Sequence, residues 1–516
     1  MNQEILKFCL KKGILLNKEV GDLLEGLDEE SIKKVIDNLH IKEKIITKTN
    51  LTKNVEQLKE IMGKDGEKII EKLYINLGLS IEVSRVTEKV EEERERQKRN
   101  IKIISSHLDN VKKLEVGDFV KHFRVRLSEM KRILQERSEL ENLISINKIN
   151  GPRESVSIIG LVYNKRITKN KNILLELEDL TGRVAVLINS NKQEVYNKAK
   201  EALLDDIVAI KGVGNREIIF ANELIYPDSR LPEKTVLDRD EAAVFISDIH
   251  CGSRNFLENN FLKFIDWING EVGDERQRKE ALKVKYLFVT GDTIDGVGVY
   301  PGQENLLEIK DIYEQYAKLA ELLGSIRKDV TIILCAGQHD AVRVAEPQPI
   351  LDKEYAGPLY ELENLIFVSN PAFVEITNEN RRGVRILMYH GASFSKFIDE
   401  IEDLRLNKGF DNPARVVRHV LKRRHLAPMH SSVTYLPIGE EDTLLIKEVP
   451  DIIATADLHK PDADIYNNVL IICSSCWQST TPFEEKVGNH PDPCKVPVLN
   501  LKTRAVKILD FSGEEK

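Results

Sequence analysis

The chain has 516 residues, more than the roughly 250 to 300 that one hydrophobic core usually serves, so two or three domains are expected. Its hydrophobic fraction of 41% allows real cores, and its formal net charge of -8 excludes a protein whose whole surface wraps nucleic acid, because phosphate binding requires a positive field. The six cysteines are scattered, the N-terminus carries no secretory pattern, and no apolar stretch approaches the roughly 20 residues that cross a bilayer, so we expect a soluble protein of the reducing cytoplasm.

The N-terminal part of the chain has a helical pattern. Residues 1–75 are predicted to form a helical module, since Ile5, Leu6, Cys9 and Leu10 recur at helical spacing. Residues 88–100 are almost entirely charged and cannot bury a face, so residues 76–115 are predicted to be a charged linker. The sequence does not define what this linker does.

Residues 116–232 are predicted to be an OB-fold domain, a five-stranded barrel with a leading helix over 120–143. Five alternating β-branched segments lie at 156–162, 173–177, 184–188, 207–210 and 218–224, and an amphipathic segment at 194–204 lies between the third and fourth, where an OB-fold carries its helix. The basic loop with Lys165, Arg166 and Lys169 is either a weak nucleic-acid contact or a solvated hairpin. Whether this domain contacts DNA or a partner subunit stays open.

Residues 233–516 are predicted to form an α/β domain in which short apolar runs end at polar side chains. These runs lead to Asp248 and His250, to Asp292 and Asp295, to Gln338, His339 and Asp340, to His390, and to Asp457 and His459. Open α/β sheets gather their sites at strand ends, so we expect these side chains to converge. If Asp248 and His250 lie on an extended strand, both face one cation. Carboxylates mixed with imidazoles favour Mn²⁺, Fe²⁺ or Zn²⁺ over an all-oxygen Mg²⁺ cage.

The order and spacing of these clusters resemble the calcineurin-like metallophosphoesterases over nearly all of residues 244–460. The resemblance implies a C-terminal phosphoesterase β-sandwich with two divalent metal ions, Mn²⁺ in the first place and Fe²⁺, Zn²⁺ or Mg²⁺ as alternatives. It implies that His339, braced by Asp340, is the catalytic imidazole. It also implies two ligand sets that share one bridging carboxylate: Asp248, His250, Asp292 and His459 for the first ion, and Asp292, Gln338, His390 and Asp457 for the second.

Three further segments narrow the resemblance. Residues 339–349, residues 422–428, and residues 476–478 together with the Pro-rich 491–497 are similar to the small subunits of archaeal family D DNA polymerases, which also carry an OB-fold and a helical N-terminus. This similarity implies a heterodimer with a large catalytic subunit, contact with DNA, and a link to the sliding clamp through that complex. It further implies a 3′ to 5′ exonuclease that removes misincorporated nucleotides.

The sequence departs from the phosphoesterase pattern at two positions of the second metal site. Gln338 stands where the family has Asn, and Asp457 stands where it has the first His of G-H-x-H. Gln338 extends its carbonyl by one methylene although metal distances tolerate only about 0.2 Å, and Asp457 adds negative charge. Three interpretations stay open: a nuclease that keeps its activity, a weakened or inactive domain that serves as a structural platform for the large subunit, and a free-standing phosphatase, which the N-terminal domains disfavour.

Two smaller features also have open interpretations. The segment 413–425 places Arg415, Arg418 and Lys422 on one helical face, which either guides a DNA strand or is simply solvated. Cys473 and Cys476 form a single C-x-x-C after an apolar β-type run, and without a second pair we expect buried strand cysteines rather than a zinc site.

Overall fold

The computed structural model describes residues 3–17, 100–106, 113–378, 381–438 and 441–513, with isolated residues between 20 and 46. The chain divides into two compact units, residues 1–95 and 96–516. The described elements of the first unit are helix α1 (Gln3–Lys11) and two short parallel strands, β1 (Leu15–Leu16) and β2 (Ile45–Ile46). Most of the predicted N-terminal helical module, and the charged run at 88–99, lie outside the described residues. In the part of the chain that is described, no helix has the length and apolar character needed to span a membrane.

The second unit begins its barrel region with helix α7 (Val116–Gln135), followed by the short 3-10 helix η2 (Ile146–Lys148) and a closed five-stranded barrel. Helix α8 (Gln193–Lys200) lies between the third and fourth strands in sequence. The barrel has the strand order β4-β5-β6-β8-β7, with β4 at Glu154–Ile167, β5 at Ile173–Asp179, β6 at Gly182–Ile188, β7 at Ile207–Gly214 and β8 at Ile218–Ile225. The predicted five strands and intervening helix are confirmed.

Helix α7 ends earlier than the predicted boundary near residue 143. Its last helical residue is Gln135, and Leu143 instead makes a β-bridge with Ser157 of the barrel. Leu140 and Leu143 pack against the apolar cluster between α7 and the barrel from this non-helical segment. Their burial therefore comes from contact with the barrel, which a helical period in the sequence does not reveal.

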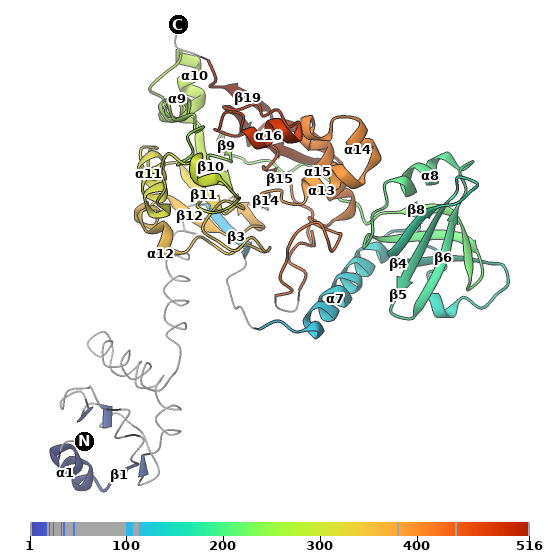
Figure 1. The fold of residues 1–516 in the computed structure, drawn as a ribbon, viewed down its shortest axis with the longest axis horizontal. Helices are drawn as coiled ribbons and strands as arrows, with labels where there is room; N and C mark the ends of the chain where they lie inside the picture. The colour runs from blue at the N-terminus through green and yellow to red at the C-terminus, as the bar shows by residue number, and fades with distance from the viewer. Residues whose placement is uncertain are drawn as a thin grey trace. The chain divides into compact units, whose positions relative to one another are not determined.

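Two six-stranded sheets form the rest of the second unit (Figure 1). The first has the order β12-β11-β10-β9-β18-β19 and the second the order β16-β17-β15-β14-β13-β3. In chain order the strands are β3 (Ile101–Ser106), β9 (Ala242–Ile246), β10 (Val284–Thr290), β11 (Thr331–Cys335), β12 (Leu365–Val368), β13 (Ala372–Ile376), β14 (Val384–Tyr389), β15 (Ile452–Thr455), β16 (Asp462–Tyr466), β17 (Val469–Cys473), β18 (Lys495–Asn500) and β19 (Val506–Asp510).

The two sheets pack face to face, because one apolar cluster draws residues from both. Phe245 and Phe288 of the first sheet lie in the same cluster as Val374 and Met388 of the second. The outer face of the first sheet is covered by α9 (Glu258–Asn269), α10 (Glu275–Leu282) and α11 (Ile312–Gly324), and that of the second by α13 (Phe394–Glu400), α14 (Glu402–Leu406) and α15 (Pro413–Arg423) (Figure 1). The remaining short elements are η3 (Gln303–Asn305), α12 (Lys353–Ala356), η4 (Gly357–Glu361), η5 (Gly409–Asp411) and α16 (Pro482–Val487).

Strand β3 corrects the predicted linker over residues 76–115. It pairs antiparallel with β13 and forms an edge of the second sheet. Ile101 is buried in the core between the sheets, and Ile103 packs against the same core. The apolar residues that follow the charged run thus belong to the sandwich.

The barrel is fixed to the sandwich by buried ion pairs. Arg423, at the end of α15, donates from Nε to both carboxylate oxygens of Asp206 at 3.0 and 3.1 Å, and both side chains are almost fully buried. On α7, Arg126 pairs with the buried Asp442, which also accepts from His425 Nε2 at 2.9 Å. Breaking such a pair leaves an uncompensated charge, so these contacts set how the barrel region is held against the sandwich.

Candidate metal centre

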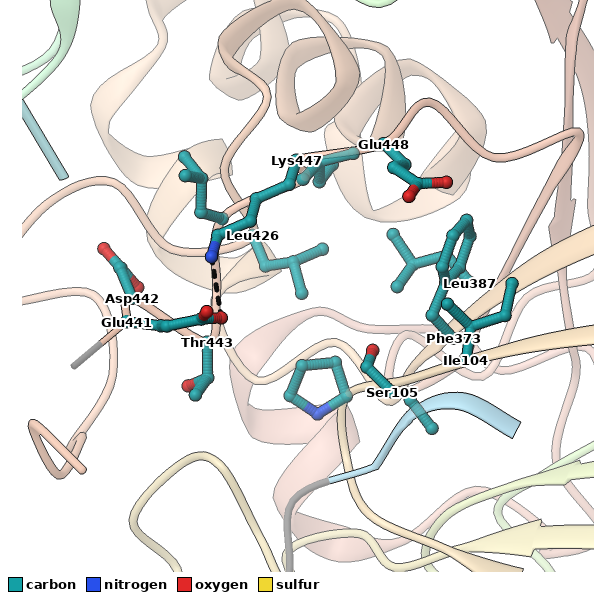
Figure 2. A pocket seen from close by; sticks show the side chains of 14 residues that line it. Ile104, Ser105, Phe373, Leu387, Leu426, Glu441, Asp442, Thr443, Lys447 and Glu448 are labelled. Atoms are coloured by element: carbon teal, nitrogen blue, oxygen red, sulfur yellow. Dashed lines mark ion pairs between the residues drawn. The ribbon is translucent and has the colours of Figure 1, made fainter. Parts of the chain in front are cut away.

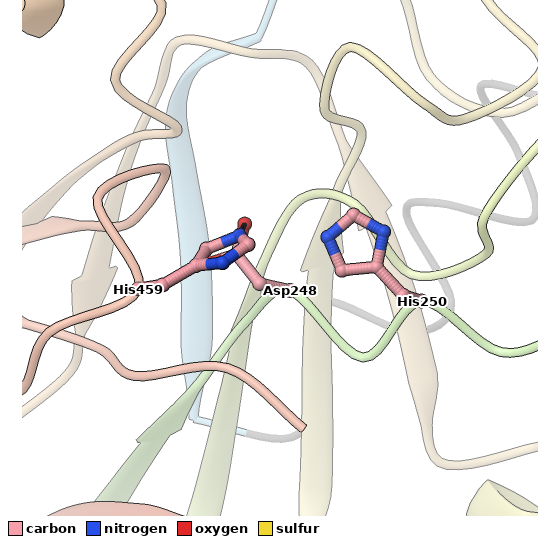
Figure 3. A group of neighbouring side chains, drawn as sticks. All are labelled: Asp248, His250 and His459. Atoms are coloured by element: carbon pink, nitrogen blue, oxygen red, sulfur yellow. Dashed lines mark ion pairs between the residues drawn. The ribbon is translucent and has the colours of Figure 1, made fainter. Parts of the chain in front are cut away.

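The eight residues predicted to form the site all follow the carboxyl ends of five strands, β9, β10, β11, β14 and β15. Their side chains converge across the two sheets. His459 Nε2 lies 3.4 Å from Asp248 Oδ1, and His390 Nε2 lies 3.3 Å from Asp292 Oδ2. Figure 3 shows the three side chains Asp248, His250 and His459 together, with the Asp248 carboxylate beside the His459 ring.

Three groups of side chains have the proximity of metal ligands. Asp248, His250 and His459 form one group, and Asp248, Asp292 and His390 form another, with ligand atoms within 4.8 Å of one another. A third group joins His250 to Asp295 and His339. The first group contains three of the four ligands predicted for the first ion, and the second joins Asp292 and His390, predicted for the second ion, to Asp248, so Asp248 is the carboxylate that the two groups share.

The backbone of the site is strained at five of these residues. The φ angles of Asp248, His250, Asp292, Asp457 and His459 lie between 46° and 71°, in the left-handed region that side chains rarely adopt. Such conformations cost about 1 to 3 kcal/mol each and gather at functional sites. The prediction that Asp248 and His250 lie on an extended strand is therefore wrong. Their side chains still converge, because both residues follow β9 in left-handed turns.

A glycine is required where the β11 turn meets Asp292. A Cβ on Gly337 would lie 2.2 Å from Asp292 Oδ1, so any larger residue would displace the carboxylate. The backbone N–H of His339 donates to the same oxygen at 2.8 Å. The turn thus holds Asp292 in place through close backbone contact.

Each histidine of the site donates from Nδ1 to an acceptor behind it. The acceptors are Asp295 Oδ1 for His250 at 3.1 Å, the Thr290 carbonyl for His390 at 2.8 Å, Glu484 Oε1 for His459 at 2.6 Å, and the Asp295 carbonyl for His339 at 2.8 Å. Because each acceptor fixes a proton on Nδ1, Nε2 is the nitrogen that can bind a metal ion, and any proton on Nε2 must leave when the ion binds. Metal-binding histidines are oriented in this way by their outer partners.

The donor atoms left over are of the kind that binds divalent metal ions. Among the described residues, Asp248 Oδ1, His250 Nε2 and His390 Nε2 are buried and have no hydrogen-bond partner. Buried polar atoms are normally paired, so three orphans at one point require an explanation. Imidazole nitrogens with carboxylate oxygens suit Mn²⁺, Fe²⁺ or Zn²⁺.

The charges of the site hold one another in ionised form. Burial opposes ionisation of Asp292, but His390, His339 and His250 keep the pKa of its carboxyl well below its usual range. Burial alone would lower the pKa of His390, yet the carboxylates of Asp292, Asp248 and Asp457 raise this pKa well above its usual value. A cluster of anions that raises the proton affinity of a buried imidazole is a cluster that attracts cations.

The two positions that depart from the phosphoesterase pattern contact each other. Gln338 Nε2 donates to Asp457 Oδ1 at 3.0 Å, across 119 residues of sequence. Asp457 Oδ1 also lies 3.7 Å from His390 Nε2. Gln338 and Asp457 therefore occupy the same side of the site, next to His390.

His339 is at the site, but Asp340 does not brace its ring. Asp340 is buried and accepts from the backbone N–H groups of Thr293 and Gly337, so it ties the β10 and β11 turns together. The two neighbouring side chains leave the turn in different directions, and the His339 ring is held by the Asp295 carbonyl instead. The predicted bracing role of Asp340 is wrong.

Two acidic residues that were not predicted as ligands hold the site in place. Asp295 positions both His250 and His339, and its Oδ2 also accepts from Gln303 Nε2 at 3.2 Å. Glu484, in the first turn of α16, positions His459. The sequence predicted that Asp295 would lie at the site with Asp292 but assigned it no role, whereas no local pattern connects Glu484 to the site.

The predicted nucleic-acid contacts are largely engaged within the protein. Lys165 donates to the carbonyls of Lys200 and Ala202 at 2.6 and 2.8 Å, so it is a structural contact. Arg166 and Lys169 are exposed on the β4–β5 hairpin. On α15, the three basic residues pair with acids: Arg415 with Asp403, Arg418 with Asp464 and Lys422 with Glu201. The structure does not support a free basic face on this helix.

Two other features lie apart from this chemistry. A cavity of about 170 Å³ is walled by β3, β13, β14 and the segment 441–448, and Figure 2 shows its apolar lining together with the Lys447–Glu441 ion pair at 2.6 Å. It contains none of the predicted site residues. Cys473 and Cys476 are both buried and unbridged, which agrees with the prediction of buried strand cysteines.

Comparison with known proteins adds four findings. Residues 243–463 match the family model for the B subunits of DNA polymerases alpha and epsilon. The chain is 40% identical over 399 residues to the DNA polymerase II small subunit of Methanothermobacter thermautotrophicus, covering 77% of this chain and 80% of that protein. It is 41% identical over 397 residues to the protein of the same name from Pyrococcus furiosus, covering 76% of this chain but 63% of that longer protein. A solved archaeal phosphodiesterase aligns with 52% of this chain and 98% of its own chain, at 12% identity and a TM-score of 0.26, which is too low to indicate a shared fold.

Proposed function

The chain belongs to the family of archaeal DNA polymerase II small subunits, and from this membership we propose that its sandwich domain is a metal-dependent phosphodiesterase that removes nucleotides from the 3′ end of DNA. The two packed sheets with polar residues at their strand ends support a calcineurin-like phosphoesterase domain. Its place in a polymerase subunit makes misincorporated nucleotides the natural substrate. The activity would then be proofreading.

One observation carries the proposal. The Nδ1 atom of each imidazole in the site is held by a hydrogen bond, and the Nε2 atoms of these rings point toward carboxylates. His250 and His390 are each buried with no hydrogen bond to Nε2, although Asp292 Oδ2 lies 3.3 Å from His390 Nε2, and His459 turns Nε2 to Asp248. A purely structural cluster would pair these atoms with one another, because an unpaired buried polar atom costs about 1 to 3 kcal/mol. A site that is built to hold cations leaves them open.

The residues divide the chemistry among themselves. Asp248, His250, Asp292 and His459 would hold one ion, and Asp292, His390, Gln338 and Asp457 the other. When bound, two such ions neutralise phosphate oxygens and lower the pKa of a water. His339 would act as the general acid that gives a proton to the departing 3′ oxygen as the phosphorus–oxygen bond breaks. Asp295 keeps the His339 ring in the orientation that turns Nε2 to the substrate.

The other parts of the chain are proposed to serve the complex. The closed barrel is proposed to be an OB-fold, and the subunit is proposed to bind a large catalytic subunit, and DNA and the sliding clamp through that complex. The domain boundaries proposed are 1–75, 76–115, 116–232 and 233–516, with β3 as the exception that joins the last domain. The barrel presents Tyr163 and Phe220 as half-exposed aromatics, and Arg183 already covers Tyr163, so protein contact is a better use of this surface than base stacking.

The proposal is tested by cleavage of 5′-labelled single-stranded and 3′-mismatched DNA by the purified full chain with Mn²⁺. The expected product ladder shortens from the 3′ end. Asp292→Asn is expected to abolish it, since the resemblance makes Asp292 the carboxylate that both ions share, and its charge acts on both His250 and His390. Asp403→Asn, which changes a surface acid paired with Arg415, is the matched control and should leave cleavage unchanged. If the wild-type chain cleaves neither DNA with any divalent ion, the domain is a structural platform for the large subunit.

A further inference from the structure

A glycine-rich loop, residues 296–302, borders the candidate metal centre beside His339. Its sequence is Gly-Val-Gly-Val-Tyr-Pro-Gly. Gly296 has a φ of +74°, and a Cβ there would lie 2.3 Å from the His339 carbonyl oxygen. The loop therefore starts in direct backbone contact with the residue proposed to protonate the leaving oxygen.

Two buried glutamines hold this loop in one conformation. Gln315 accepts from Gly296 N at 2.9 Å and donates to the Gly296 carbonyl at 3.2 Å and the Ile309 carbonyl at 2.7 Å. Gln303 accepts from Val299 N at 2.8 Å and donates to the Asp295 carbonyl at 2.7 Å. Both side chains are 0% exposed. Buried amides with satisfied donors and acceptors rigidify the backbone that they bind, so the loop is a built feature of the site.

The fixed loop presents apolar side chains outward. Val297 is 48% exposed and Val299 is 39% exposed, although both belong to a well-anchored segment. The ring of Tyr300 lies edge-on to that of His339, with centroids 6.2 Å apart and planes at 64°. An aromatic ring and two valines thus stand at the edge of the site, adjacent to the proposed proton donor.

We propose that Val297, Val299 and Tyr300 form a platform that packs against the unpaired 3′-terminal nucleobase of a DNA strand. The inference rests on the proposed function, since a phosphate held beside His339 brings its attached nucleoside next to these side chains. Contact of this kind tolerates any base, because every base has a π-face. A paired terminal base must first leave its partner, and this costs least at a mismatch. The platform therefore selects frayed and mismatched ends without reading sequence.

The platform is tested by the fluorescence of 2-aminopurine placed at the 3′ end of a single-stranded oligonucleotide, bound to the full chain in an Asp292→Asn background that prevents cleavage. Stacking on Tyr300 should quench the probe. Tyr300→Ala should remove the quenching and weaken binding by about 5- to 150-fold, while Tyr300→Phe, which keeps the ring, should restore both. Tyr313→Ala is the matched control, since Tyr313 is a surface tyrosine, 49% exposed, that stacks on Tyr355 instead.

The outcomes separate the platform from the nuclease. The platform is contradicted if the Tyr300→Ala protein quenches 2-aminopurine fluorescence as much as its Asp292→Asn parent does, or if the parent does not quench it at all. It is also contradicted if Tyr300→Ala weakens the binding of an oligonucleotide with an abasic 3′ end by the same factor. If the probe is quenched but the wild-type chain cleaves no DNA with any divalent ion, the platform stands and the nuclease proposal fails. If Tyr300→Ala lowers the melting temperature, Val299→Ser is used as the second variant. We expect Val299→Ser to lose part of the quenching, and unchanged quenching would count against the platform.

Discussion

The contact between Gln338 and Asp457 gives the most specific prediction about the altered half of the metal centre. Gln338→Asn shortens the side chain by one carbon–carbon bond, about 1.5 Å, which takes its amide out of range of Asp457 Oδ1, now 3.0 Å away. Asp457→His removes the acceptor. The double change restores the Asn and His pair of the phosphoesterase pattern. Because both positions border the same ion, their effects are expected to be non-additive.

The size of the coupling follows from the bond that each change removes. A hydrogen bond to a charged group contributes about 1.5 to 3 kcal/mol, so without metal the unfolding free energies of the four proteins should show a coupling in that range. With metal, the cleavage rate of the double variant should exceed the value expected from the two single variants by about tenfold, which corresponds to about 1.4 kcal/mol. The double variant should also cleave faster with Mg²⁺ and Zn²⁺, relative to its rate with Mn²⁺, than either single variant does.

The assay is a double-mutant cycle on the rate of 3′-end cleavage in Mn²⁺, Mg²⁺ and Zn²⁺, with denaturant unfolding of the same proteins in EDTA. Gln338→Asn combined with Asp464→Asn is the control cycle, because Asp464 pairs with Arg418 on the surface and should add independently. Strictly additive or neutral effects of Gln338→Asn and Asp457→His would mean that these positions do not share an ion. Asp457 would then be no ligand.

Three further predictions concern stability and assembly. Asp206→Ala should lower the unfolding free energy by about 3 to 5 kcal/mol, because Arg423 is then buried without its partner. Arg418→Ala on the surface should change the unfolding free energy by less than about 1 kcal/mol. Equal effects of the two variants in chemical denaturation would contradict the role of the buried pair. Burial, and after it the nearby Arg126, lowers the pKa of His425 from its ordinary 6.5 to about 4. The folded state therefore favours the neutral imidazole, and the stability that this supplies is complete above pH 6.5. As the pH falls, this stability is lost, by about 3 kcal/mol at pH 4. A His425→Gln variant whose stability varies with pH just as the wild type's does would refute this. Co-expression with a large polymerase subunit should yield a complex that buries more than roughly 1,000 Å², and a small subunit that elutes alone at low salt would count against it.

The sequence predicted the parts of the site that depend on local pattern. The barrel strands follow from alternating apolar residues, and the ligands follow from polar residues at the ends of apolar runs. The left-handed backbone at Asp248 and His459 could not be predicted, because it depends on how strands far apart in sequence meet. The same is true of Glu484, which lies 25 residues from the His459 that it orients. Lys165 appeared available from sequence because nothing local shows that its ammonium is captured by two carbonyls.

The central claim is that two cations bind between the strand ends, and anomalous diffraction from crystals of the full chain soaked in Mn²⁺ tests it most directly. We expect two anomalous peaks, one bordered by Asp248, His250 and His459 and the other by Asp292 and His390, with Asn at position 292 removing at least one of them. An anomalous map without peaks, or with peaks only away from these side chains, would contradict the account.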